Sequence, residues 1–257
     1  GKVTAKGARF SRIGAMSTGS KIAMGLLALI VLVSILAPQV SPYGPDEIFD
    51  KWSAPSGDHL FGTDHVGRDI FARVLYGGRF SLMIGLCSTL IALFFGAIIG
   101  SIAAVVRKSF SEAIMRVMDI VMAVPGIAMA AVSVLVFGRT LSKSGNTFGL
   151  VVVIICSIAF VYIPQLSRIV RANVMAAYGE DYVRAVIVSG ARAPWILTKH
   201  VMRNTAAPVL VFATVLVADA IILEASLTFI GSGLQATTVA TWGNVLSEAS
   251  SNLSVLQ

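Results

Sequence analysis

Between two long apolar runs the chain reads Gly179-Glu-Asp-Tyr-Val-Arg-Ala-Val-Ile-Val-Ser-Gly190-Ala-Arg-Ala-Pro-Trp-Ile-Leu-Thr-Lys-His200-Val-Met-Arg-Asn-Thr205. This stretch contains a group of basic side chains: Arg184, Arg192, Lys199, His200 and Arg203. Charges of this density are too costly to bury in the hydrocarbon core of a bilayer. The stretch is therefore expected to lie in water beside a membrane.

The pattern within this stretch predicts a short helix, a turn and a second helix. Tyr182 and Val186 stand four residues apart on one face of the first helix, and Asp181 places negative charge in its first turn. Gly190 suits the end of that helix because glycine enters the left-handed conformation without steric cost. Pro194 can open the next helix. A short amphipathic helix on a glycine elbow suits either docking of a soluble partner or contact with lipid headgroups.

The composition on either side indicates a membrane protein. Hydrophobic residues make up 56% of the 257 residues, and charged residues only 13%. A helix needs about 20 apolar residues to cross the hydrocarbon core. Five stretches meet that length, near residues 22–40, 81–106, 115–137, 148–167 and 206–231. The sequence thus predicts an all-α, polytopic transmembrane helical bundle.

The positions of the basic residues predict how the bundle is oriented. Fourteen of the 20 lysines and arginines lie in residues 1–21, 107–116 and 168–205. By the positive-inside rule these segments face the cytoplasm. We therefore expect a cytoplasmic N-terminal segment 1–21 and a membrane domain 22–257, with an external loop 41–80 and a cytoplasmic loop 168–205. The same bias explains the net charge of +7, so no nucleic-acid partner is expected.

The loop 41–80 contains a second polar segment, His59-Leu-Phe-Gly62-Thr-Asp64-His-Val-Gly67-Arg68-Asp69. Asp69 precedes an apolar helical stripe that begins at Ile70, so it is a natural N-cap. The doublets Asp58-His59 and Asp64-His65 could hold a metal ion. Turn formation and helix capping are the commoner roles for such residues in a loop.

Three acidic residues fall inside the predicted spans: Asp119, Asp219 and Glu224. An acid in a span normally faces the bundle interior or water. Asp119 follows Arg116 by three residues, so it is expected either to line a pathway or to pair with Arg116 or another base. Asp219 and Glu224 are about 140° apart around a helix, so they cannot act as one carboxylate pair. Each is a candidate for lining a pathway or for a polar contact.

Small and flexible residues indicate where the helices pack. Gly96 and Gly100 have the spacing that lets two membrane helices approach closely. A methionine stripe in the third span, beside a kink expected at Pro125-Gly126, suits core packing or an adaptable pathway.

Both polar segments resemble motifs of one family, the C-type permeases of dipeptide and oligopeptide ABC importers. The stretch 179–205 resembles the "EAA" loop of ABC importer permeases, although Arg184 stands where the family usually has Glu. The segment 59–69 resembles the "LGTD-x-x-GRD" segment of the peptide permeases. The residues that carry the resemblance are Tyr182, Val183, Arg184, Ala185, Val186, Ser189, Gly190, Ile196 and His200 in the first segment, and Gly62, Thr63, Asp64, Gly67, Arg68 and Asp69 in the second.

The resemblance implies a permease of the type I ABC importer class, with a sixth span expected beyond residue 257, in the inner membrane of a bacterium. It implies that the loop 180–205 couples to a cytoplasmic ATPase subunit, and that this subunit binds ATP and Mg. A homologous second permease would complete the pathway, and an extracytoplasmic substrate-binding protein would deliver di- or oligopeptides. Membrane lipid would surround the spans.

The absence of catalytic motifs fits a chain that is not itself an enzyme and binds no cofactor or metal. The run from Gly14 to Lys21 resembles a phosphate-binding loop, but Ser20 occupies the lysine position. Two alternatives stay open. The same architecture could import nickel or another non-peptide solute, or the three intramembrane acids could serve a proton-coupled carrier.

Overall fold

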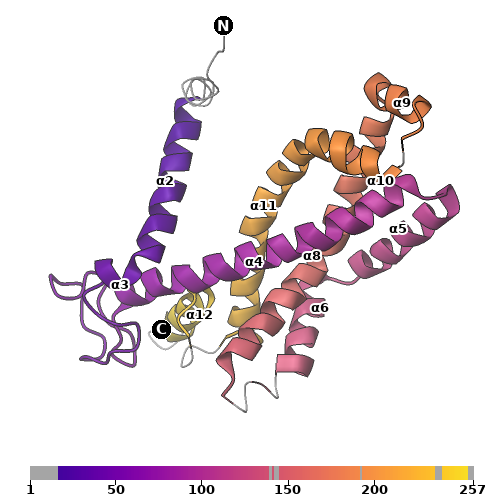
Figure 1. Cartoon of the computed structure of the whole chain (residues 1–257). Coiled ribbons are helices and arrows are strands. Elements are labelled where there is room, and N and C mark those ends of the chain that lie inside the picture. The colour runs from indigo at the N-terminus through magenta and orange to yellow at the C-terminus, as the bar shows by residue number, and fades with distance from the viewer. Residues whose placement is uncertain (1–16, 139–140, 142–144, 192, 235–238, 254–257) are drawn as a thin grey trace, which may run out of the picture. The chain divides into compact units, whose positions relative to one another are not determined.

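The computed structural model describes residues 17–138, 141, 145–191, 193–234 and 239–253, and these fold as helices joined by loops (Figure 1). Two isolated β-bridges, Ile48–Arg68 and Thr63–Asp69, supplement the helices. The prediction of an all-α protein is confirmed. The chain divides into two compact units, Gly1–Arg79 and Phe80–Gln257, and α4 (Ile70–Val105) belongs to both.

The first unit contains α2 (Thr18–Ile35), α3 (Ala37–Val40), the loop 41–69 and the first turns of α4. Ser17 caps α2, because its side chain accepts a hydrogen bond from the N–H of Ser20 at 3.2 Å. After Lys21 nearly all side chains of α2 are apolar, and almost all of them are exposed within the chain. Such a helix is suited to lipid or to another membrane helix.

The second unit is built around α8 (Thr147–Tyr178), and α11 (Met202–Phe229) makes the most extensive contact with it (Figure 1). Its core is made of aliphatic side chains such as Ile154, Ile158 and Leu216. The remaining elements are α5 (Lys108–Ala123), α6 (Gly126–Ser133), η1 (Val134–Gly138), α9 (Asp181–Val188), α10 (Ala193–Ile196), η2 (Leu197–Val201) and α12 (Trp242–Leu253).

The two glycines of α4 show which helix their spacing serves. A Cβ on Gly96 would lie 2.6 Å from the Cβ of Leu166, and one on Gly100 would lie 2.5 Å from the carbonyl oxygen of Ser167. Both contacts are shorter than atoms allow, so only glycine permits α4 to approach α8 this closely. The contact predicted from the spacing therefore lies between α4 and α8.

Four helices are individually long and apolar enough to span a membrane: α2, α4, α8 and α11. The predicted span 115–137 is instead a bent pair, in which α5 and the segment Gly126–Gly138 meet at 83°. Val124 is extended, with ψ of 130°, and Pro125 follows it. The bend has a physical cause, because proline disfavours helical backbone in the residue before it. Counting the bent pair as one span gives the predicted five.

Candidate functional site

The loop 168–205 contains the predicted helix, turn and helix. Helix α9 ends at Val188, and Gly190 follows with φ of +83°. The N–H of Ala191 reaches back to the carbonyl of Val186 at 3.4 Å, which is the bond expected when a left-handed residue closes a helix. The predicted role of Gly190 as a helix terminator is confirmed. Pro194 lies in the first turn of α10, also as predicted.

The inner face of α9 is fixed to the end of α8. Val183 is fully buried, in a cluster with Val174 and Ala177 of α8. Ile196 and Val201, which follow the turn, complete that cluster. A second tie joins α9 to α11, since the Nδ2 of Asn204 donates a hydrogen bond to the Tyr182 hydroxyl at 2.7 Å. These contacts hold α9 as a rigid projection rather than as a free loop.

The outer face of the same projection combines apolar and basic groups. Val188 is 87% exposed, and Tyr182 and Trp195 also present large surfaces to solvent. Arg184 is exposed beside them and lies 4.0 Å from Asp181 of the same helix. An exposed apolar surface with a charged rim is typical of a protein interaction site.

The residues predicted to couple the loop to an ATPase therefore fall into a buried group and an exposed group. Val183 and Ile196 belong to the buried cluster, and Val186 is half-buried against it, whereas Tyr182, Arg184, Ala185, Ser189 and Gly190 are exposed. His200 lies in η2, but its side chain is outside the described residues, as is Arg192.

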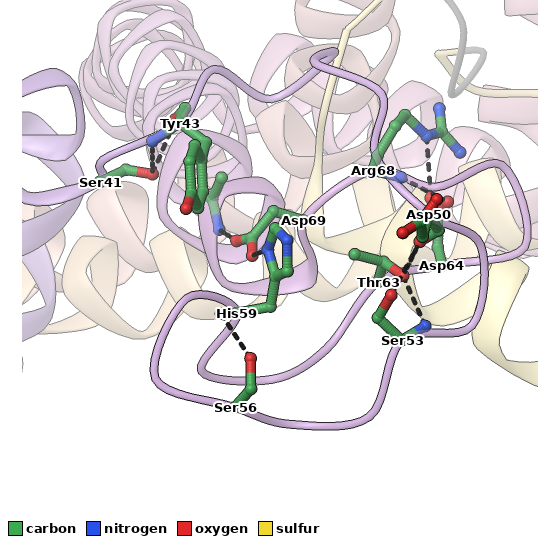
Figure 2. A network of polar contacts seen from close by, with 11 residues as sticks. Ser41, Tyr43, Asp50, Ser53, Ser56, His59, Thr63, Asp64, Arg68 and Asp69 are labelled. Atoms are coloured by element: carbon green, nitrogen blue, oxygen red, sulfur yellow. Dashed lines mark hydrogen bonds and ion pairs between the residues drawn. The ribbon is translucent and has the colours of Figure 1, made fainter.

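In the loop 41–69, Asp64 is the centre of a polar network (Figure 2). Its Oδ1 accepts the N–H groups of Val66, Gly67 and Arg68 at 2.8, 2.9 and 3.0 Å. Its Oδ2 accepts the Nε of Arg68 at 2.8 Å. Burial favours a higher pKa for Asp64, but the backbone donors of Arg68 and Val66 and the Arg68 guanidinium outweigh it and lower the pKa below its usual value.

Thr63 and Asp69, at either end of the segment around Asp64, form hydrogen bonds of their own. The Thr63 hydroxyl donates to the carbonyl of Asp50 at 2.5 Å and accepts the N–H of Ser53 at 2.8 Å (Figure 2). Asp69 caps α4, because its Oδ1 accepts the N–H of Ala72 at 2.7 Å. Its Oδ2 lies 2.8 Å from the Nδ1 of His59. The predicted N-cap is confirmed, and His59 and Asp64 both serve turn and capping contacts.

Glycine is required twice in the same segment. Gly62 has φ of +74° and Gly67 has φ of +104°. A Cβ on Gly62 would lie 2.3 Å from the carbonyl oxygen of Ser53, and one on Gly67 would lie 2.2 Å from that of Phe49. The segment 62–69 thus combines side-chain caps with two close backbone approaches that only glycine permits.

Among the intramembrane acids, Asp119 pairs with a base from another helix. Its Oδ1 contacts the guanidinium Nη2 of Arg168, on α8, and both side chains are half exposed. One helical turn further along α8, the Nε of Arg171 donates to the Ser111 hydroxyl at 3.0 Å. Of the bases considered as partners of Asp119, the structure shows Arg168 and not Arg116, which is three residues away in the sequence. Sequence spacing gives no signal for it, because Arg168 is 49 residues away.

Glu224 is fully buried and accepts hydrogen bonds from hydroxyl groups. The hydroxyls of Ser81 and Thr228 each donate to its carboxylate at 3.1 Å. The Ser81 hydroxyl also accepts the N–H of Trp242 at 3.2 Å. A small hydrogen-bond network therefore joins α4, α11 and the start of α12. Asp219, five residues earlier, is exposed and lies near Tyr162 of α8. The two acids thus lie on different faces of α11, as their angular separation predicts, and only Glu224 is buried.

Several long apolar helices, one bent pair of helices and an exposed projection between α8 and α11 are the features of a multi-pass membrane protein. Residues 96–256 match the family described as "Binding-protein-dependent transport system inner membrane component", and the chain belongs to that family.

Named relatives extend the match over most of the chain. A peptide transport system permease protein of Brucella suis is 38% identical over 230 residues, which are 89% of this chain and 74% of the relative. The oligopeptide transport system permease protein OppC of Bacillus subtilis is 35% identical over 87% of this chain and 70% of its own length. The dipeptide transport system permease protein DppC of Alkalihalophilus pseudofirmus is 33% identical over 87% and 71%.

Proposed function

We propose that the chain forms half of the translocation pathway of an ATP-driven importer for di- or oligopeptides. Relatives whose names specify dipeptide, oligopeptide or peptide transport support the peptide substrate. The observation that carries the mechanism is the rigid α9 projection, with Val183 buried and Val188 exposed. A fixed helix end can transmit a force between a soluble motor and the membrane helices to which it is packed.

In this proposal α9 docks on a cytoplasmic ATPase, which supplies the bound ATP and Mg. The exposed Tyr182, Arg184, Ala185, Val188 and Ser189 contact the ATPase. The buried Val183 passes movement to α8, and the Asn204–Tyr182 hydrogen bond passes it to α11. ATPase closure would then reach both helices through a single rigid element.

We also propose an orientation of the chain in the membrane and its remaining partners. The N-terminus and the loop 168–205 lie in the cytoplasm, and the loop 41–69 lies outside, where a substrate-binding protein delivers the peptide. A homologous second permease completes the pathway. Asp219 is the pathway candidate among the acids, because it is exposed in a span. Glu224 has a structural role and Asp119 holds α5 to α8.

Reconstitution tests the proposal. The chain, its second permease and its ATPase subunits are placed in proteoliposomes with the peptide-loaded binding protein, and uptake of labelled di- and hexapeptides is measured. We expect uptake that requires ATP and the binding protein. Uptake driven by a proton gradient without the ATPase would contradict the importer, and competition by Ni²⁺ but not by peptides would contradict the peptide substrate.

Cysteine labelling tests the orientation in a background without Cys87 and Cys156. A cysteine at Ser56 should react with an impermeant reagent in intact cells, and a cysteine at Ser189 should react only after the cells are opened. Both positions are exposed, so accessibility does not limit either reaction. The reverse pattern would overturn the orientation.

A further inference from the structure

Charged residues distinguish the two arms of the bent pair of helices. Four of them lie on α5: Lys108, Glu112, Arg116 and Asp119. The arm after the bend, Gly126–Gly138, contains none. The two arms meet at 83° (Figure 1), so they cannot both run along the membrane normal. Because a charge is costly to bury in hydrocarbon, the second arm is suited to enter the bilayer and α5 is suited to lie at its surface.

The side chains of α5 form three faces. The first packs on α8 and contains Ser111, which is buried and accepts a hydrogen bond from the Nε of Arg171 at 3.0 Å. The charged residues fall together on the second face, because a helix turns by about 100° per residue. The third face is apolar and exposed, since Phe110, Val117 and Ile120 are 66%, 53% and 69% exposed. Outside its contact with α8, the helix is therefore amphipathic.

Two basic side chains at this helix have no acidic partner. The acids of α5 each have a basic neighbour, because Glu112 lies 4.0 Å from the lysine at the start of the same helix and Asp119 contacts Arg168 of α8. Arg107, which precedes α5, and Arg116 are exposed and form no ion pair with any described residue. Uncompensated positive charge thus lies beside an exposed apolar face.

We propose that α5 lies along the membrane surface, with its apolar face about 5–10 Å into the leaflet and with Arg107 and Arg116 bound to the phosphates of anionic phospholipids. Apolar residues opposite a basic polar face are typical of a helix in this position. Guanidinium groups bind phosphate through charge-assisted hydrogen bonds. In the proposed orientation of the chain this is the cytoplasmic leaflet, and the contact itself depends on neither the cargo nor the ATPase.

The surface beyond the bend favours lipid over a protein partner. Val132 and Val136 on the second arm are 58% and 62% exposed. The exposed surface therefore changes from wholly apolar along this arm to amphipathic along α5. A bilayer changes in the same order, from acyl chains to headgroups. A protein partner that buried Arg107 and Arg116 would instead need a carboxylate for each of them.

Depth measurements test the position of α5. The chain is purified with the subunits that remain bound to it and is placed in nanodiscs. Single spin labels are attached to cysteines at Glu112, Val117 or Val132, in a background without Cys87 and Cys156. Collisions with oxygen report lipid, and collisions with a water-soluble nickel complex report water. The label at Val117 should meet oxygen but not nickel and should be shallower than the label at Val132, whereas the label at Glu112 should meet nickel.

Three results of this experiment would contradict the proposal. A label at Val117 as deep as the label at Val132 would make α5 part of the buried span. Contact of the Val117 label with nickel would place the apolar face in a water-filled pathway. Shielding of the same label from both reagents would place the face against another subunit.

A comparison of lipids tests the phosphate contact. A fluorescent label at Val117 is quenched by phosphatidylglycerol or by phosphatidylcholine that carries a nitroxide high on the acyl chain. The anionic lipid should bind more tightly, and Arg116→Gln should reduce this preference about fivefold, since one basic residue near anionic lipid contributes about that factor. Lys51→Gln removes an exposed positive charge of the loop 41–69 and should leave the preference unchanged. Equal quenching by both lipids in the wild type, or equal effects of the two variants, would overturn the site.

Discussion

Asp119 on α5 forms an ion pair with Arg168 on α8, and this pair ties one arm of the bent span to the central helix. Arg171 reinforces the tie through Ser111. The other arm, α6, contacts both α8 and α11. Because the two arms meet at 83°, any movement of α5 against α8 must change the bend or break the pair. The pair is therefore placed to resist a change in the bend between α5 and α6.

An exchange of the two charges tests this role. Asp119→Arg places two guanidinium groups together, and Arg168→Asp places two carboxylates together, so each variant should reduce transport and stability. A half-exposed pair contributes about 1 kcal/mol or less in water, so the like-charge variants should show the larger effect. The double variant should recover at least half of the loss. Measurements of uptake and thermal unfolding decide it.

The control is the exposed Lys108–Glu112 pair, whose atoms are 4.0 Å apart on α5. Glu112→Lys should leave both measurements unchanged. If the double variant Asp119→Arg/Arg168→Asp is no better than the single variants, the ion pair is not what the substitutions disturb.

The local parts of the fold could be predicted from sequence because they depend on nearby residues. Gly190 ends α9 and Asp69 caps α4 through contacts within a few residues. The apolar stretches were also readable, because hydrocarbon thickness sets their length. The helix ends differ from the predicted span ends. Helix α8 continues to Tyr178 and α4 begins at Ile70, whereas the predicted spans end at residue 167 and begin at residue 81. Helices extend beyond the hydrocarbon wherever packing continues, and hydropathy does not record that.

Partners across the fold could not be predicted in the same way. The spacing of Gly96 and Gly100 predicts a close helix contact but does not say that α8 provides it. Ser81 shows no sequence signal for its bond to Glu224, which lies 143 residues away. The backbone of Trp52 has φ of +59°, which its sequence does not predict, because hydrogen bonds from the N–H groups of Trp52 and Ser53 to residues 63–64 hold it there. Such features depend on topology, which periodicity does not encode.

Gly190→Val should uncouple the importer without removing it from the membrane. A β-branched residue at φ of +83° is strained by about 1–2 kcal/mol, but no atom lies within 4 Å of its Cβ. We therefore expect normal insertion, with α9 reoriented and ATP hydrolysis no longer stimulated by the loaded binding protein. Gly190→Asn, which tolerates this conformation better, should keep most of the stimulation. An unchanged transport rate in Gly190→Val would remove the coupling role from the loop.

Gly100→Leu should separate α4 from α8. Its Cβ would lie 2.5 Å from the carbonyl oxygen of Ser167, and overpacking of this kind costs about 1–3 kcal/mol or more. The purified protein should unfold at a lower temperature in detergent. Gly25→Leu, on the exposed α2, meets no atom within 4 Å and should be neutral. Equal unfolding temperatures for the two variants would contradict the close packing of α4 on α8.

Acid should loosen the loop 41–69 through Asp64. The pKa of this carboxyl is lowered in the folded protein, so its ionised form contributes stability that is fully present above the unfolded pKa of about 3.9. That contribution is lost as the pH falls through the lower, folded pKa. Protection of the Val66, Gly67 and Arg68 amides against hydrogen exchange, relative to the intrinsic rate at each pH, should therefore decrease below about pH 4, since all three donate to Asp64. Asp64→Asn should weaken their protection at neutral pH by about 1.5–3 kcal/mol and abolish the loss of protection in acid.

The control is Asp46→Asn, which alters an exposed acid of the same loop and should keep the loss of protection in acid. If that loss survives in Asp64→Asn, it belongs to another titrating group.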